Sequence, residues 1–215
     1  MPAVMDGKQR VTETSQVSPL DYLVRSIRQI DSLTDEDADI LRRIVESKDY
    51  KKGQFLTRQG QIENYVYFVA AGIVRNYLVQ DGEDLTFDIF FPGSFTNAFT
   101  SFIIRDKAQV SVQALTPVNV LRLHFSKLKR LYDHSLYFNR LGRKIAEFQY
   151  IRRTRREISF VSQTPKERYE ALLSGNPVLV QQIPLKYLAT YLGIKPETLS
   201  RIRKSRTVSK RKRLS

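Results

Sequence analysis

The side chains best suited to recognising another molecule lie near the C-terminus, on a predicted helix that begins at Pro196. Its apolar residues, Leu199 and Ile202, are three positions apart and are expected to face inward. The residues around them carry hydrogen-bonding groups and are expected to face outward; they are Glu197, Thr198, Ser200, Arg201 and Arg203. One apolar face and one hydrogen-bonding face are what a recognition helix in the major groove of DNA needs.

A second predicted helix comes directly before it and can hold it in place. Its apolar residues recur at helical spacing on one face: Leu185, Leu188, Ala189 and Leu192. Gly193 then suits a left-handed C-terminal cap, and Pro196 suits a first turn because its missing N–H would be unpaired there. This spacing predicts a helix-turn-helix, with an ordinary αα-hairpin as the alternative.

The charge of the chain favours a polyanionic partner. The chain has 215 residues and a formal net charge of +14. Eight of the thirteen residues from 201 to 213 are Lys or Arg, and a second cluster comprises Arg152, Arg153, Arg155 and Arg156. Such an asymmetry indicates one end that docks on nucleic acid or on an anionic membrane surface.

Several kinds of site are excluded by composition. The absence of cysteine excludes disulfides, iron–sulfur clusters and thiolate zinc sites. The two histidines, His124 and His134, lie in no recognisable metal-binding or catalytic motif. No apolar run approaches the roughly 18 residues of a membrane span, and the N-terminus does not resemble a signal peptide. We therefore expect a cytoplasmic protein of bacterial type that has no metal site and no membrane partner.

The middle of the chain has the pattern of a β domain. Short β-type segments are predicted over residues 65–69, 73–79, 85–91, 110–115 and 118–123. Glycine recurs between them, and Asp81-Gly82 is a strong hairpin signal. Many short strands at regular spacing are typical of a sandwich or a jelly-roll barrel. Helical patterns precede this region, over Leu20–Ile30 and after a cap at Ser32 or Thr34.

A long helix is predicted from about Leu136 to Phe160. Its apolar residues approximate a 3-4 repeat: Phe138, Leu141, Ile145, Phe148 and Ile151. That repeat favours packing against another helix, most simply the same helix in a second copy. The alternative is a helix that packs only on its own β domain.

These parts, in this order, resemble the Crp/Fnr superfamily of bacterial transcription regulators, in the form common in the Bacteroidetes branch. The most specific segments are Tyr67–Val74 with Gly60, Phe91–Phe95 and Gly193–Ile202. The family joins a cyclic-nucleotide-binding-like β-roll to a dimerisation helix and a winged helix-turn-helix, which makes an α+β fold. The expected division is a flexible arm (1–18), a β-roll sensory domain (19–135), a dimerisation helix (136–160), a helix-turn-helix DNA-binding domain (161–205) and a disordered basic tail (206–215).

The resemblance also implies roles for residues of the recognition helix. The family reads bases with a glutamate and an arginine four residues apart, and Glu197 and Arg201 match that pattern. Arginine can bind guanine through two hydrogen bonds, and glutamate can accept one from cytosine. In the cyclic-AMP regulator another arginine precedes the glutamate; here Pro196 stands there, so the same half-site is not expected. Contacts to the DNA backbone, or else ordinary solvent exposure, are expected of Thr198, Ser200, Arg203 and Lys204.

Residues 93–114 resemble, without a gap, the phosphate cassette of the members that bind cyclic AMP. Asn97-Ala98 replaces a Gly-Glu pair that holds the ribose, and Ala108-Gln109 replaces an Arg-Ser pair whose arginine neutralises the phosphate. Because the phosphate would lack that charge-assisted partner, we do not expect cyclic AMP to bind in the usual way, and we expect no cofactor. An apolar or acidic effector in the β-roll, or no effector, stays open. The candidate pocket residues are Asn97, Ala98, Phe99, Ser101, Ala108 and Gln109.

The sequence therefore predicts a dimeric DNA-binding transcription regulator. Two copies would bind a pseudo-palindromic operator with half-sites about one helical turn apart, and RNA polymerase would be a further partner. The alternative is a module that binds a small molecule and contacts nucleic acid or a membrane surface non-specifically. An enzyme is the weakest interpretation, because no catalytic motif surrounds Asp84, Asp88, Ser101 or His124.

Overall fold

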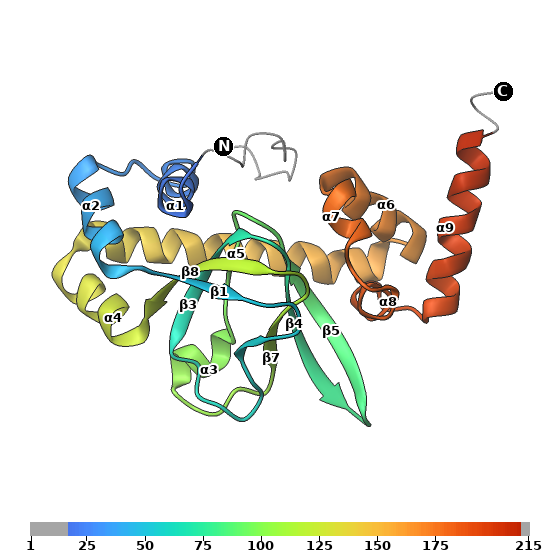
Figure 1. Ribbon diagram of the computed structural model, residues 1–215, viewed down its shortest axis with the longest axis horizontal. Helices are drawn as coiled ribbons and strands as arrows, with labels where there is room; N and C mark the ends of the chain where they lie inside the picture. Colours follow the sequence, from blue (N-terminus) through green and yellow to red (C-terminus); the bar gives the residue numbers. More distant parts are fainter. Residues whose placement is uncertain (1–16, 212–215) are drawn as a thin grey trace.

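The structure is a computed structural model that describes residues 17–211, with the side chains of 179 and 206–211 left out. A β-roll occupies the middle of the molecule, and the C-terminal helices lie at one end of it (Figure 1). Before the roll come α1 (Pro19–Arg28) and α2 (Asp35–Ile44). The roll contains β1 (Glu46–Tyr50), β2 (Phe55–Thr57), β3 (Tyr65–Ala71), β4 (Val74–Gln80), β5 (Glu83–Phe90), β6 (Phe95–Thr96), α3 (Phe99–Ile104), β7 (Ser111–Ala114) and β8 (Val118–His124). After it come α4 (Phe125–His134), α5 (Leu136–Ser162), α6 (Pro165–Gly175), α7 (Pro177–Gln181), α8 (Leu185–Leu192) and α9 (Pro196–Arg211).

The two helices that precede the β-roll begin where side chains cap their free N–H groups. The hydroxyl of Ser18 accepts a hydrogen bond from the backbone N–H of Asp21, and the hydroxyl of Thr34 accepts one from that of Asp37. Of the two expected caps for the second helix, Thr34 is therefore correct and Ser32 is not. The expected arm, 1–18, falls almost wholly outside the described residues.

The β-roll consists of two four-stranded sheets. Their strand orders are β1-β8-β3-β6 and β2-β7-β4-β5, and every pairing is antiparallel. Asp81 and Gly82 both have positive φ angles, 53° and 79°, as a tight hairpin turn between β4 and β5 requires. The expected β-roll with flanking helices is confirmed. The sequence pattern missed β1, β2, β6 and α3, because these elements are short or, like β1, mostly polar and exposed.

Three apolar clusters hold the molecule together. The first lies between the sheet that contains β3 and β8 and the helices α1, α2, α4 and α5. The second fills the interior of the roll, with Tyr67, Val74 and Val120 among its members. The third joins the β-roll to the C-terminal helices, since Ile73 and Ile89 pack with Leu188 and Leu192 of α8. The C-terminal helices thus share a core with the roll.

The long helix α5 runs from the end that holds α2 and α4 to the C-terminal helices (Figure 1). Its first half packs on its own domain: Phe138 and Leu141 are buried there, and Ile145 is half-buried. The expectation that these residues form a seam with another copy is therefore wrong. Apart from Leu136 at its first position, the large apolar side chains of α5 that are exposed lie in its second half, and they include Tyr150, Ile151, Ile158 and Val161.

A buried arginine connects the roll to the C-terminal helices. The Arg75 side chain, on β4, is 1% exposed, and its guanidinium forms an ion pair of 2.6 Å with Asp84 on β5. It also donates hydrogen bonds of 2.9 and 2.7 Å to the side-chain oxygen of Gln113. The guanidinium carbon lies 3.7 Å from the ring centroid of Tyr77 and 3.5 Å from that of Tyr187, which belongs to α8. Arg75 is therefore sandwiched between a ring of the roll and a ring of the C-terminal helices.

Arg152 and Arg156 belong to the arginine cluster that was predicted to dock on a polyanion. Both contact the interface between the roll and the C-terminal helices. Arg152 forms an ion pair with Asp88 on β5. Arg156 donates hydrogen bonds to the backbone oxygens of Phe87 and Tyr191, each at 2.9 Å. Arg153 and Arg155 remain exposed. Half of this cluster therefore serves internal packing, because Arg152 and Arg156 are four residues apart and so lie on the same face of α5.

The end of the chain is more helical than expected. Helix α9 continues to Arg211, so residues 206–211, which we expected to be part of a disordered tail, are helical. Residues 212–215 of that tail lie outside the described residues. Between Gln163 and Arg211 the structure contains no strand, so the expected wing has no strands in that range.

Replacing Arg75 should destabilise the protein far more than replacing an exposed arginine. In Arg75→Ala, Asp84 and Gln113 lose their shared partner and two rings lose the cation between them. We expect a loss of roughly 3 kcal/mol in the free energy of unfolding, measured by denaturant titration. Arg75→Lys should recover little of it, because an ammonium group cannot reproduce the planar stack and the forked hydrogen bonds.

The matched control is Arg42→Ala, which removes an exposed arginine paired with Asp21 and Asp39. That change should cost at most about 1 kcal/mol. Equal effects of the two alanine variants would contradict the role assigned to Arg75.

Candidate functional site

The outer face of α9 carries the polar side chains that the sequence singled out. Glu197, Thr198, Arg201 and Lys204 are exposed. On the opposite face Leu199 is fully buried and Ile202 is half-buried, packed with the apolar residues of α8. Neither Glu197 nor Arg201 forms a hydrogen bond or an ion pair with any residue that the structure describes. Both side chains are therefore available to a partner, four residues apart on one side of the helix.

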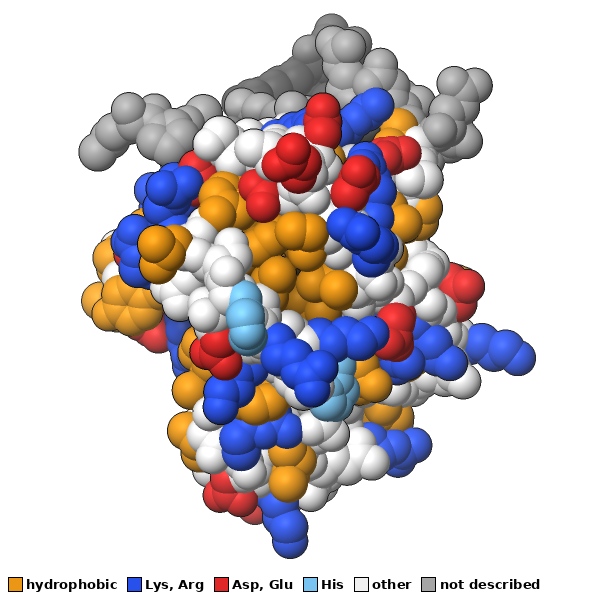
Figure 2. Space-filling model, turned by 90° about the vertical axis from the view of Figure 1, so that its left-hand side faces the viewer, with side chains coloured by type: hydrophobic (Ala, Val, Ile, Leu, Met, Phe, Trp, Pro, Cys, Tyr) orange, Lys and Arg blue, Asp and Glu red, His pale blue; other side chains and the backbone are white. Residues whose placement is uncertain are grey.

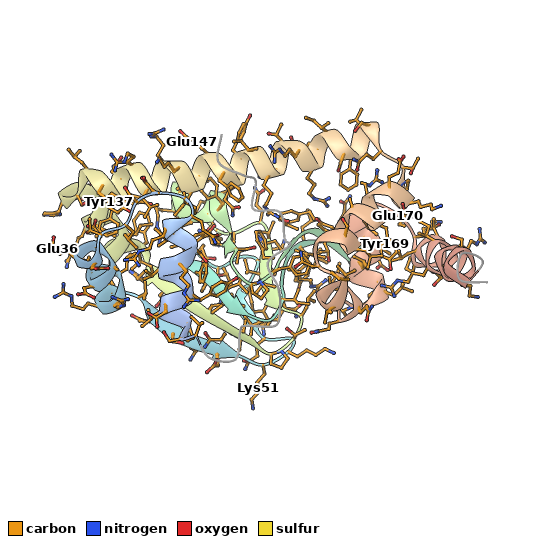
Figure 3. All side chains as sticks on the ribbon, turned by 90° about the horizontal axis from the view of Figure 1, so that it is seen from above. Glu36, Lys51, Tyr137, Glu147, Tyr169 and Glu170 are labelled. Atoms are coloured by element: carbon orange, nitrogen blue, oxygen red, sulfur yellow. The ribbon has the colours of Figure 1, made fainter. Side chains whose placement is uncertain are left out.

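Two of the expected backbone-contacting residues are less accessible. Ser200 and Arg203 are half-buried. The Arg203 guanidinium donates a hydrogen bond of 3.2 Å to the hydroxyl of Tyr169, which lies on α6 beside α9 (Figure 3). Arg203 thus contributes to the attachment of α9 to the neighbouring helix.

Helix α8 sets the position of α9, and arginines hold its C-terminal end. Gly193 ends α8 with a φ of 71°, and a Cβ at that position would lie 2.7 Å from the Phe160 ring of α5. The last carbonyls of α8 accept hydrogen bonds from Arg156 of α5, at Tyr191, and from Arg168 of α6, at Leu192. Free carbonyls at a helix end need such donors, and cations there also interact favourably with the helix dipole. The turn before α9 is therefore fixed by both α5 and α6.

The six candidate effector residues differ in their exposure. Ala98, Ser101 and Ala108 are buried, whereas Asn97 is half-buried. Phe99 is 57% exposed and Gln109 is also exposed. That these residues line an effector pocket stays a prediction.

A buried acid that the sequence analysis missed lies beside this segment. Glu63 is 1% exposed, and its carboxylate accepts hydrogen bonds from the Thr57 hydroxyl at 2.6 Å and from the backbone N–H of Ala98 at 3.1 Å. It accepts two more, from the N–H of Tyr65 at 3.0 Å and the hydroxyl of Tyr67 at 3.3 Å. Burial raises the pKa of Glu63, and the four donors act in the opposite direction by favouring the carboxylate. No sequence motif marks Glu63. The only feature that could have pointed to it is an acidic residue shortly before the apolar strand β3.

Arg105, a basic residue near this segment, is held by hydrogen bonds. Its guanidinium donates a hydrogen bond of 2.6 Å to the backbone oxygen of Glu63 and another to the Asn64 side chain. It also lies 4.1 Å from the centroid of the Phe125 ring. Arg105 therefore links the end of α3 to neighbouring segments.

The residues weighed as catalytic have structural partners instead. Asp84 and Asp88 pair with Arg75 and Arg152. The Ser101 hydroxyl accepts a hydrogen bond from the N–H of Glu63, and His124 caps α4 by accepting one from the N–H of Ser126. Within residues 17–211 no cluster of three or more His, Asp or Glu side chains could hold a metal ion. None of the described helices combines the length and apolar character needed to cross a bilayer.

Comparison with known proteins supports the fold and the class of protein. Residues 47–135 match the family model described as the cyclic nucleotide-binding domain. The transcriptional activator protein anr of Pseudomonas aeruginosa is 28% identical over 189 residues, which cover 80% of this chain and 75% of that protein.

Solved structures with the same fold include two proteins from other bacteria. FixK2 from Bradyrhizobium japonicum has a TM-score of 0.63 at 19% identity, over 77% of this chain and 86% of its own. The regulator CLP from Xanthomonas campestris has a TM-score of 0.62 at 18% identity, over 80% of this chain and 90% of its own. At such low identity these two structures support the fold alone.

Proposed function

We propose that this chain, which belongs to the Crp/Fnr superfamily of transcription regulators, binds a specific DNA sequence through α8 and α9. The observation that carries the proposal is the pair Glu197 and Arg201, exposed and unpaired within the described residues on the face of α9 opposite the buried Leu199. This arrangement supports α9 as a helix that enters the major groove, with Arg201 reading guanine and Glu197 reading cytosine. Thr198 and Lys204, also exposed, would contact phosphates.

The second part of the proposal is that two copies pair through α5. Ile151 and Ile158 are seven residues apart, and so are Thr154 and Val161, which is the spacing of a heptad seam. The three apolar members of this set are exposed, at 48%, 57% and 92% in chain order. Pairing along this stripe would set the separation of two α9 helices, as a pseudo-palindromic operator with half-sites about one turn apart requires.

An effector, where one exists, would act by favouring one arrangement of the C-terminal helices on the roll. The contacts through which it would act are those of Arg75 with Tyr187 and of Arg156 with Tyr191. The name of the Pseudomonas relative, a transcriptional activator, supports RNA polymerase as a further partner.

We further propose that cyclic AMP does not bind the β-roll in the usual way. Ala108 offers no cation, and Arg105 is already bound to Glu63 and Asn64. A buried carboxylate, Glu63, lies 3.1 Å from the N–H of Ala98, where it would repel a phosphate.

Cyclic AMP should therefore leave the melting temperature of the purified protein unchanged. A ligand present at a hundred times its Kd would stabilise the folded state by about 2.7 kcal/mol, which a thermal-shift assay detects easily. A regulator known to bind cyclic AMP serves as the positive control. A clear rise in the melting temperature at millimolar cyclic AMP would contradict the proposal.

Arg201→Ala should weaken binding to the specific DNA site by roughly 1–3 kcal/mol and relax the preference at one base pair. The DNA is first selected by the wild-type protein from a random pool and then used in electrophoretic shift assays at fixed salt. Lys204→Ala should weaken binding to all sequences alike, because a phosphate contact carries no sequence information.

The control for a lost positive charge is Arg43→Ala, at the far end of the molecule on α2, and it should leave DNA binding unchanged. If the wild-type protein enriches no sequence from the pool, the proposal of specific binding fails. A uniform, salt-sensitive loss in Arg201→Ala would favour the alternative of a non-specific basic surface.

Ile158→Glu should convert the dimer to a monomer at equal protein concentration, because it places a charge in the apolar seam of α5. Sedimentation velocity measures the change. Val178→Glu, on α7, replaces a side chain that is 54% exposed and should leave the dimer intact. A wild-type protein that sediments as a monomer would refute the pairing.

A further inference from the structure

A cavity of about 110 Å³ lies outside the β-roll, between one of its sheets and the surrounding helices. Phe68 of β3 and Leu121 of β8 contribute to its lining from the sheet. Helices α1, α2, α4 and α5 supply most of the rest, including Leu23, Tyr132 and Leu141. The space-filling view of this end of the molecule shows apolar side chains gathered around a central hollow (Figure 2).

The lining of this cavity is almost wholly apolar. Every lining residue is apolar or glycine except Tyr132, whose hydroxyl is the only polar side-chain group there. That hydroxyl forms no hydrogen bond with any residue in the described part of the chain. It lies against α5 at Gly142, where an added Cβ would be 2.1 Å from the oxygen. Burial raises the pKa of Tyr132, so at neutral pH the phenol is protonated and can donate a hydrogen bond.

The interior of the roll differs from this cavity in its chemistry. Its apolar side chains pack against one another, and the neighbouring Glu63 already accepts hydrogen bonds from four donors. A cavity lined by apolar side chains, in contrast, stays free of water and admits apolar molecules; cavities of roughly 150 Å³ bind benzene. A charged molecule is excluded from the outer cavity, because nothing there could pair with it.

We propose that this outer cavity binds a small uncharged molecule, about the size of a single ring, with one polar group that hydrogen-bonds to Tyr132. Such a ligand contacts α5 through Leu141, Gly142 and Ile145, just before the exposed stripe of that helix. Resting on the function proposed above, the ligand favours one position of α5 and so changes the affinity of the dimer for DNA.

The binding test uses the full-length protein and does not involve DNA. Phenol is the probe, benzene is the analogue without a hydroxyl, and benzoate is the charged analogue, each titrated by calorimetry. Phenol and benzene should bind saturably, and benzoate should not. Absence of saturable binding by phenol and by benzene overturns the proposal, and so does equal binding by benzoate.

Tyr132→Phe tests the hydrogen bond without changing the volume of the cavity. It should weaken phenol binding about fivefold, as expected for the loss of one hydrogen bond, and leave benzene binding unchanged. Tyr50→Phe is the matched control, since Tyr50 is also half-buried but lies outside this cavity. Equal effects of the two variants on phenol binding overturn the role of Tyr132.

Val45→Phe places a larger side chain at the cavity lining and should abolish the binding of both compounds. Circular dichroism checks that the variant is folded, and Tyr132→Phe provides the test if it is not. Electrophoretic shifts with and without phenol then address the coupling separately. Saturable phenol binding without a change in DNA affinity confirms that the cavity binds a ligand and overturns its coupling to α5. Failure of the protein to bind DNA at all concerns only the function proposed above.

Discussion

The structure depends on the requirement that a buried guanidinium be fully paired. Arg75 is the largest of the fully buried side chains, and an unpaired charge at that position would be very costly. Its partners come from β4, β5, β7 and α8, so no single segment satisfies it. The β-roll and the C-terminal helices are therefore linked by a contact that has strict geometry. A movement of Tyr187 or Asp84 would leave Arg75 incompletely paired. The β-roll and the C-terminal helices are therefore suited to a few distinct relative positions and not to continuous sliding.

The same interface determines how α9 is displayed. Arg156 and Arg168 bind the last carbonyls of α8, and Phe160 occupies the space that a side chain at Gly193 would need. The turn that precedes α9 is thus held by α5, the helix that carries the proposed dimer seam. In the proposed dimer, pairing of the two chains through α5 would therefore also set the positions of the two α9 helices. The inner face of α9 packs on the rest of the chain, and its outer face is exposed.

The β-roll departs in a physically consistent way from the phosphate cassette that residues 93–114 resemble. A carboxylate, Glu63, accepts hydrogen bonds at the start of α3, and Arg105 is directed to backbone and amide oxygens. The roll interior is consequently packed around an internal acid. Free space of apolar character lies instead on the outside of the sheet, under α1, α2, α4 and α5. A ligand there would touch α5 directly.

Local patterns in the sequence were sufficient for β3, β4, β5, β7 and β8, the Asp81-Gly82 hairpin, the long helix and the buried face of α9 with Leu199. Each of these follows from interactions between residues that are close in the chain. The same patterns placed Ser200 and Arg203 on the outer face of α9, whereas both are half-buried. The sequence could not show which face of α5 packs on its own roll, that Arg152 and Arg156 bind β5 and α8, or that Glu63 meets Ala98. The hydrogen bonds among these contacts join residues from 35 to 69 positions apart, and only the packing of whole elements brings them together. The sequence by itself therefore predicted which side chains α9 carries. The tertiary structure alone determined how α9 is held by the neighbouring helices and where the cavity lies. The reason is that burial and charge pairing depend on segments that are distant in the chain.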